Sequence, residues 1–135
     1  MALISENNAS ILVVHDGEEL TGIIARFLRH EGYKVLEAQN PAEAVAIAKS
    51  GVAIDVLMAQ YDLPGLNGVK LGSKIRTVRP TLPMVFLTGD LDAGESIVGN
   101  GFIWLRKPLL FAELTATLTT ALGQPFSPKP AGPIW

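Results

Sequence analysis

The sequence predicts a three-layer α/β fold, in which a parallel sheet of five strands is covered by helices on both faces. Two observations carry this prediction. Five short apolar runs alternate with helical segments along the chain, and this alternation is typical of parallel sheets buried between two helical layers. Each run also leads into polar or Gly/Pro-containing residues, as at the strand ends where open α/β sheets place their chemistry.

The first strand and helix are predicted at the start of the apolar pattern. Residues 10–15 form a β-branched run that ends in polar residues, which indicates a buried strand. The helix that follows carries apolar side chains at one-face spacing, and Gly32 is its C-terminal stop. Its apolar face consists of Leu20, Ile23, Ile24, Phe27 and Leu28.

A second strand and helix follow. Residues 33–38 are the strand candidate. The helix start is marked by Asn40, whose side chain is a good cap, by Pro41 in the first turn, and by Glu43 at the capping-box position. The helix is rich in alanine, and we expect it to end near Gly51.

The rest of the chain continues the alternation. Gly94 and Gly99 weaken one of its helices, because glycine has a low helix propensity. The predicted strands are residues 54–59, 84–88 and 101–105, and the predicted helices are residues 67–78, 91–98 and 110–122.

Composition limits the functional classes. The net charge of −2 and the scattered lysines and arginines give no electrostatic case for binding nucleic acid or an anionic membrane. The chain has no cysteine, which excludes disulfides and thiolate metal sites. His15 and His30 do not have metal-ligand spacing. Because no apolar run reaches membrane-spanning length and cysteine is absent, we expect a cytoplasmic protein.

The chain divides into three parts. Residues 1–9 are a polar N-terminal extension that lacks the basic region and long apolar stretch of a signal peptide. Residues 10–122 form one predicted domain, long enough for a substantial core. Residues 123–135 are rich in proline and show no helical or strand pattern, so we expect a flexible tail.

Four motifs lie at the ends of successive predicted strands. They are residues 11–16 (ILVVHD), 55–68 (DVLMAQYDLPGLNG), 86–89 (FLTG) and 104–108 (WLRKP). Together they resemble the receiver domain of two-component response regulators, and the resemblance covers residues 10–122. It implies a flavodoxin-like receiver fold with strand order 2-1-3-4-5.

The resemblance also implies the positions of a phosphorylation site. In the family, paired acids after the first strand hold Mg²⁺, and an aspartate ending the third strand accepts a phosphoryl group. A Thr or Ser and a Lys after later strands contact that group. Matched motif by motif, the acid pair falls on His15 and Asp16 and the acceptor on Gln60. The hydroxyl falls on Thr88 and the lysine on Lys107.

Two further residues match the family pattern. In relatives, an aromatic side chain three residues before the lysine acts as a rotating switch, and Trp104 takes this position. For Trp104 we favour a fixed role in packing or at an interface. The family's Lys–Pro bond is typically cis, which makes Pro108 the candidate for a cis peptide.

His15 and Gln60 depart from the family, and both departures affect the chemistry. Phosphoryl transfer to a side chain needs an anionic oxygen nucleophile, whereas a carboxamide is neutral. Mg²⁺ prefers charged oxygen ligands, and Asp16 is the one that remains, so we expect weak or absent magnesium binding. We expect Asp16 to pair with Lys107 and Gln60 to form hydrogen bonds, which would hold the pocket in one state without metal.

Other roles are open to some residues. His15 is a candidate phosphoryl acceptor, but a histidine hydrogen-bonded to its neighbours is the simpler interpretation, and a nearby Asp16 would favour its charged form. Asp62 is a candidate substitute acceptor, although its side chain is expected to point outward. Asp55, at the entrance to the third strand, is interpreted as a solvated turn residue.

The leading hypothesis is a non-enzymatic pseudo-receiver that acts through protein–protein interaction, independently of phosphorylation. Its partner would be a histidine kinase, an output protein, or a second copy bound through the fourth-helix, fifth-strand and last-helix face. Nucleic acid, membrane and cofactors are not expected. Two alternatives stay open: a phosphoryl-accepting receiver that uses Asp62, and a small-molecule-binding module that uses the vacated pocket.

Overall fold

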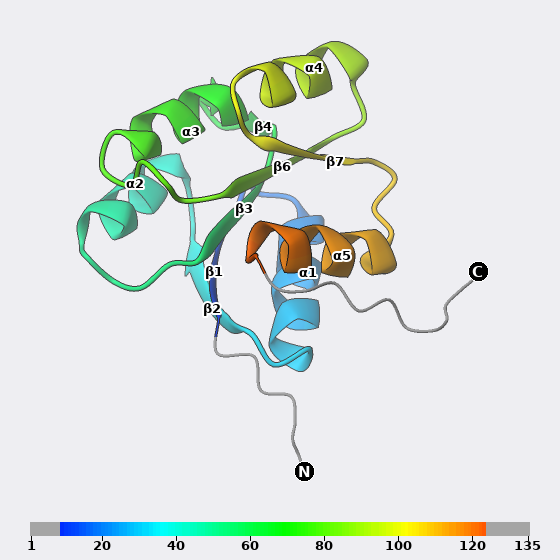
Figure 1. Ribbon diagram of the computed structural model, residues 1–135, viewed down its shortest axis with the longest axis horizontal. Coiled ribbons are helices and arrows are strands. Elements are labelled where there is room, and N and C mark those ends of the chain that lie inside the picture. Colours follow the sequence, from blue (N-terminus) through cyan, green and yellow to red (C-terminus); the bar gives the residue numbers. More distant parts are fainter. Residues whose placement is uncertain (1–8, 124–135) are drawn as a thin grey trace.

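The computed structural model describes residues 9–123, and its main sheet has five parallel strands (Figure 1). The strands are β1 (Ser10–Val14), β2 (Lys34–Ala38), β3 (Val56–Gln60), β6 (Met84–Thr88) and β7 (Ile103–Arg106). The helices are α1 (Glu19–His30), α2 (Pro41–Lys49), α3 (Gly68–Arg76), α4 (Leu91–Gly99) and α5 (Phe111–Ala121). The sheet order β2-β1-β3-β6-β7 confirms the predicted topology 2-1-3-4-5.

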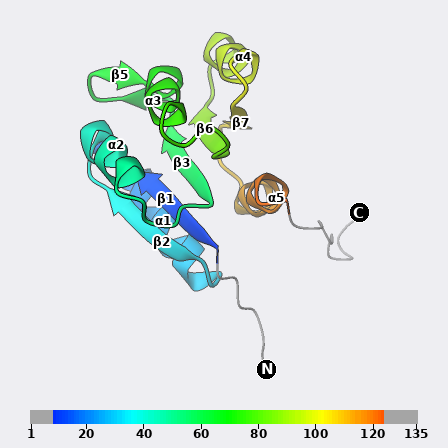
Figure 2. The same cartoon turned by 60° about the vertical axis from the view of Figure 1, so that its left-hand side comes forward.

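Helices cover both faces of the sheet, as Figures 1 and 2 show from two directions. α1 and α5 cover one face, and α2, α3 and α4 cover the other. Successive side chains of β1 alternate between the two cores: Leu12 and Val14 belong to one, and Ile11 and Val13 to the other. All five residues of β1 are buried, which explains why its sequence is an apolar run rather than an alternating pattern.

The predicted start of α2 is confirmed. Asn40 Oδ1 accepts a hydrogen bond from the Glu43 amide at 2.8 Å, and Pro41 is the first helical residue. Glu43 Oε1 accepts from the Gln39 amide at 2.5 Å, so its carboxylate binds the residue before the cap. Gly32 follows the end of α1 with φ +96°, a conformation that glycine adopts without steric cost.

One β-hairpin was missed by the sequence interpretation. The segment after β3, predicted as a Pro-Gly loop, contains two short antiparallel strands, β4 (Asp62–Leu63) and β5 (Leu66–Asn67). They are joined by the Pro64–Gly65 turn, in which Gly65 has φ +84°. Strands of two residues carry no periodic pattern, so apolar spacing gives no indication of them.

The described residues bear on some expectations and leave others aside. The predicted N-terminal extension and the Pro-rich tail lie outside them, except for residues 9 and 123. Between residues 9 and 123, no helix combines the length and apolar character needed to cross a membrane. Asp55 is exposed at the end of the sheet away from the candidate site, and its Oδ2 accepts from the Ser10 amide at 2.7 Å. It therefore also ties the start of β3 to β1.

Candidate functional site

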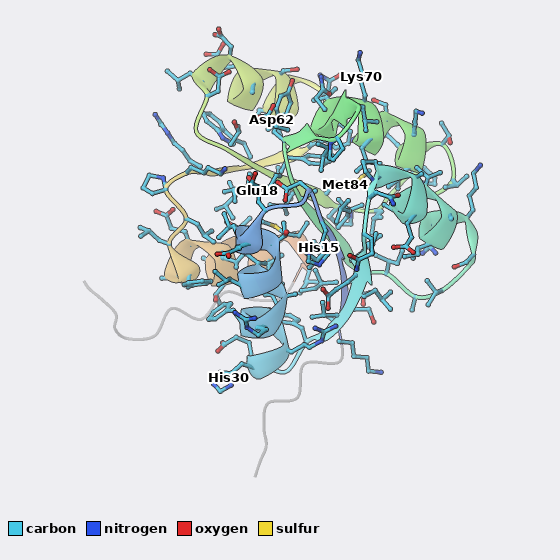
Figure 3. The ribbon with its side chains drawn as sticks, turned by 180° about the vertical axis from the view of Figure 1, so that it is seen from behind. His15, Glu18, His30, Asp62, Lys70 and Met84 are labelled. Atoms are coloured by element: carbon cyan, nitrogen blue, oxygen red, sulfur yellow. The ribbon has the colours of Figure 1, made fainter. Side chains whose placement is uncertain are left out.

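A cavity of about 860 Å³ opens at the carboxyl ends of the strands. Its walls come from the loop after β1, the N-terminus of α1, the end of β3, the β4–β5 hairpin and the loop after β7. Gln60 contributes to it from β3, and Asp16 and Lys107 from the loops. Figure 3 shows Glu18 and Asp62, which also line the cavity, at this end of the molecule. The structure thus brings four of the predicted residues together: Asp16, Gln60, Asp62 and Lys107.

Gln60 is the last residue of β3 and is 5% exposed. Its carboxamide has no hydrogen-bond partner among residues 9–123, and its side chain lines the cavity. The expectation that Gln60 forms hydrogen bonds within the pocket was therefore wrong. Thr88 is also 5% exposed and ends β6, where its Oγ1 accepts from the Asp90 amide at 3.1 Å.

His15 is held by neighbours on β2 and α1. One ring nitrogen, Nε2, lies 2.6 Å from Glu37 Oε1, and the other, Nδ1, lies 3.1 Å from the Thr21 hydroxyl. Arg29 forms an ion pair with Glu37, in which Nη1 lies 2.6 Å from Oε2. The His15 hydrogen bond, followed by the Arg29 interaction, lowers the pKa of Glu37 below its usual range. The simpler interpretation of His15, as a hydrogen-bonded histidine, is confirmed, but its carboxylate partner is Glu37 rather than Asp16.

Asp16 has local partners. Its Oδ1 accepts from the Glu18 amide at 3.0 Å and from the Thr21 hydroxyl at 3.4 Å. Lys107 is exposed, and it forms no ion pair with Asp16 in the part of the chain that the structure describes. The expected Asp16–Lys107 pairing was therefore wrong. The physical reason is that Asp16 accepts from the amide two residues further along its own loop, and this local bond competes well with a solvated ammonium group.

The donors present do not fit Mg²⁺. Asp16 is the one carboxylate at the matched ligand positions, because Gln60 is neutral and His15 is engaged with Glu37. Within the described chain, no group of three or more His, Cys, Asp or Glu side chains is arranged to hold a metal ion.

Trp104, on β7, packs against α4. Its Nε1 donates to the Thr88 carbonyl at 3.0 Å, and its ring lies against Gly94. The Arg106 guanidinium carbon lies 5.5 Å from the ring centroid on the same strand. The Lys107–Pro108 peptide that follows is cis. These contacts link the end of β6 to the inner face of α4.

Sequence reasoning missed Glu37, Arg29 and the role of Gly94. Glu37 is a partly buried acidic residue of β2, whose other charged residue, Lys34, is exposed, and a partly buried charge in a strand of a covered sheet indicates a specific partner. The register of β1 and β2, which pairs Val13 with Glu37, is what brings that carboxylate to His15. No local pattern in the sequence gives this register.

A five-stranded parallel sheet with polar residues at the carboxyl ends of its strands is typical of open α/β domains, which bind ligands where the strand order reverses. Residues 11–119 match the family model of the response regulator receiver domain. The chain belongs to this family. The family match confirms the resemblance inferred from the four motifs.

Similar proteins agree with this assignment. The transcriptional regulatory protein TcrA of Mycobacterium tuberculosis is 31% identical over 123 residues, which are 89% of this chain and 48% of TcrA. The receiver domain of the hybrid histidine kinase CckA is 32% identical, with a TM-score of 0.71 over 84% of this chain and 99% of that domain. CheY4 of Vibrio cholerae is 25% identical, with a TM-score of 0.76 over 86% of this chain and all of CheY4. The chain spans between 19% and 52% of the length of the curated relatives it matches.

Proposed function

We propose that this receiver domain signals without phosphorylation and acts through protein–protein interaction. The observation that carries the proposal is Gln60, a carboxamide at the end of β3 where a receiver needs an anionic acceptor. A neutral amide oxygen is a poor nucleophile toward phosphorus at neutral pH. Gln60 is also 5% exposed, so a phosphoryl donor would meet it only through the cavity.

Phosphoryl transfer is tested directly by mass. The full chain is incubated with acetyl phosphate and MgCl₂, and its intact mass is then measured. We expect no added phosphoryl group. A stoichiometric adduct would overturn the proposal, and its position would be found by fragmentation.

A substitute acceptor is the second candidate, because Asp62 is exposed and lines the same cavity as Lys107. In that reaction an Asp62 carboxylate oxygen would attack the phosphorus of acetyl phosphate, the bond to the acetyl oxygen would break, and acetate would leave. An adduct that forms on the wild type and is absent from Asp62→Asn would establish this candidate.

Weak magnesium binding is part of the proposal and is supported by the donor set of Asp16, His15 and Gln60. A cation that binds the folded state stabilises it by RT ln(1 + [Mg²⁺]/Kd), so weak binding gives little stabilisation. We expect thermal unfolding of the wild-type chain to be the same with and without millimolar MgCl₂. A large magnesium-dependent rise of the midpoint would contradict it.

The proposed partners are a histidine kinase, an output protein or a second copy, and the proposed location is the cytoplasm. The surface proposed for a homodimer comprises α4, β7 and the start of α5, where Leu91, Val98 and Leu110 are 52%, 58% and 54% exposed. Exposed apolar side chains on such a surface favour association. Sedimentation should show a dimer that Val98→Glu dissociates and that Val52→Glu, on a distant loop, leaves intact.

Small-molecule binding in the vacated cavity remains a less supported alternative. The cavity is open and its walls are mainly polar, unlike the largely apolar, enclosed pockets that hold most small ligands. A thermal-shift screen would support this alternative if a compound raised the unfolding midpoint of the wild type and not of Gln60→Met.

A further inference from the structure

We propose that the cavity at the carboxyl edge receives an arginine side chain from the partner protein. The inference rests on the proposed function, because it names the chemistry of the partner at the same site. Two independent observations carry it: an unpartnered amide in the cavity and the charge of the cavity wall.

The first observation is the carboxamide of Gln60. The residue is 5% exposed, and its side-chain oxygen and nitrogen have no hydrogen-bond partner among the described residues. No fully enclosed side-chain polar atom lacks a partner within the described chain, so the polar end of Gln60 opens into the cavity. The amide oxygen has no protein partner and faces the cavity, so it can accept a hydrogen bond from a ligand that enters there.

The second observation is the sign of the surrounding charge. Four acidic residues, Asp16, Glu18, Glu19 and Asp62, line the cavity, and Lys107 is the one basic residue among those that line it. The N-terminus of α1 adds a partial positive charge of about one half, but the Glu18 amide is already bonded to Asp16. The wall remains strongly negative, which favours a cation and disfavours phosphate.

The shape and lining favour a guanidinium group over a bare ion. A volume of about 860 Å³ is far larger than one metal ion needs. A guanidinium presents planar N–H donors that can bind the Gln60 oxygen and a carboxylate at the same time. Leu20 and Leu63 also line the cavity and are partly buried, so they offer apolar contact to the stem of an arginine side chain.

The open mouth favours an arginine that belongs to a protein. Glu18, Glu19 and Asp62 are exposed at the rim, where they would meet a partner's surface rather than enclose a small molecule. A free cation would leave these rim carboxylates largely in water. A partner that brings an arginine on a larger surface would cover them and exclude water from the Gln60 contact.

The test uses the full chain, labelled with ¹⁵N, and the blocked tripeptide acetyl-Gly-Arg-Gly-amide. When the arginine tripeptide is added, we expect the NMR signals of the Gln60 side-chain NH₂ group and of the backbone amides of residues 16–19 and 60–64 to shift. The Kd of this binding should be on the order of 1 mM. The matched tripeptide with citrulline in place of arginine, which keeps the shape and lacks the charge, should bind at least about tenfold more weakly. Equal binding of the two peptides would overturn the proposal.

Variants locate the site. Asp62→Asn, at an exposed position, should weaken arginine-peptide binding several-fold, and Gln60→Met should do the same if its unfolding midpoint is retained. Glu95→Gln, on the exposed side of α4, removes the same charge far from the cavity and should bind like the wild type. Unchanged binding by Asp62→Asn would overturn the proposal whatever the stability of Gln60→Met.

Three further probes separate the occupants. Tighter binding of free agmatine than of the arginine tripeptide would indicate a small cation and overturn the partner inference. Tighter binding of inorganic phosphate or MgCl₂ would overturn the charge argument. If the chain gains no phosphoryl group and binds no arginine peptide, this inference fails alone. A phosphoryl adduct on the chain would overturn the proposed function, and the arginine inference would fall with it.

Discussion

Gly94 of α4 lies against the indole of Trp104 on β7. A Cβ atom at position 94 would overlap the ring atoms Cε2, Cζ2 and Cδ2 of Trp104. On the sheet side, the indole Nε1 donates to the Thr88 carbonyl. The ring therefore occupies space that exists because position 94 has no side chain, and the glycine that weakens α4 as a helix is required by its packing.

We expect Gly94→Ala to destabilise the domain despite alanine's higher helix propensity. Overpacking costs about 1–3 kcal/mol, against a propensity gain of about 1 kcal/mol. Because the Cβ would overlap three ring atoms, we expect the upper end of the cost and a net loss in the free energy of unfolding of up to about 2 kcal/mol. Urea unfolding measures this loss. In a Trp135→Phe background, Trp104 is the remaining tryptophan of the two, and its emission should shift to the red as the ring is displaced.

Gly99→Ala is the matched control for that substitution. Gly99 also belongs to α4, but a Cβ there would meet nothing within 4 Å. Its stability should be unchanged or raised by up to about 1 kcal/mol. A Gly94→Ala variant with wild-type stability and emission would show that α4 moves aside without cost.

The second prediction concerns Glu37. Its pKa is lowered in the folded state, chiefly by the His15 hydrogen bond and then by Arg29. A lowered folded pKa means that the stabilisation is present above the unfolded pKa, about 4.3, and is lost as the pH falls through the lower folded value. At pH 7, Glu37→Gln should cost about 1 kcal/mol. The difference from the wild type should shrink as the pH falls below about 4.

Urea unfolding from pH 7 to pH 3 measures this pH dependence. Glu31→Gln is the control, because Glu31 is exposed and its side chain has no partner within residues 9–123. It should follow the wild-type profile. A Glu37→Gln difference that stays constant over the whole range would show that the carboxylate is not the stabilising group.

The third prediction concerns the cap of α2. Asn40 Oδ1 satisfies the Glu43 amide, which would otherwise be one of the unpaired donors of the first turn. Asn40→Ala should lower the free energy of unfolding by about 1 kcal/mol. Asn40→Ser, which keeps a capping oxygen, should restore most of it. Equal loss in both variants would assign the effect to something other than the cap.

The main strands and the helices could be predicted from the sequence because that information is local, whereas the strand order came from the resemblance to receiver domains. Each main strand is an apolar run between polar ends. The start of α2 is marked by Asn40, Pro41 and Glu43, which lie within four consecutive residues. The site depends on register instead. His15 binds Glu37 because β1 and β2 align Val13 with Glu37, and pairing of strands that are distant in sequence cannot be read from either strand alone.

The wrong expectations have a common physical cause. We expect from the sequence that Asp16 pairs with Lys107 and that Gln60 forms hydrogen bonds inside the pocket. Both expectations assumed that polar groups near one another pair across the site. Asp16 instead accepts from the Glu18 amide of its own loop, and the Gln60 side chain has no hydrogen-bond partner among the described residues. Local backbone bonds of this kind compete well with long-range pairs.

The last prediction is that chemistry can be restored to this scaffold. His15→Asp with Gln60→Asp restores carboxylates, together with Asp16, at the three positions matched to the family's metal and acceptor residues, and three crowded carboxylates favour a divalent cation. At a magnesium concentration ten times its Kd, binding should stabilise the double variant by about 1.4 kcal/mol, seen as a magnesium-dependent rise in the unfolding midpoint. We expect acetyl phosphate then to add one phosphoryl group, because the chain keeps a hydroxyl and a lysine, Thr88 and Lys107, at the positions matched to the family's phosphoryl-contacting residues. The single variant His15→Asp, which keeps the carboxamide, should bind magnesium more weakly and accept no phosphoryl group. A double variant that folds but remains unmodified would mean that the scaffold around the site has diverged along with its two ligands.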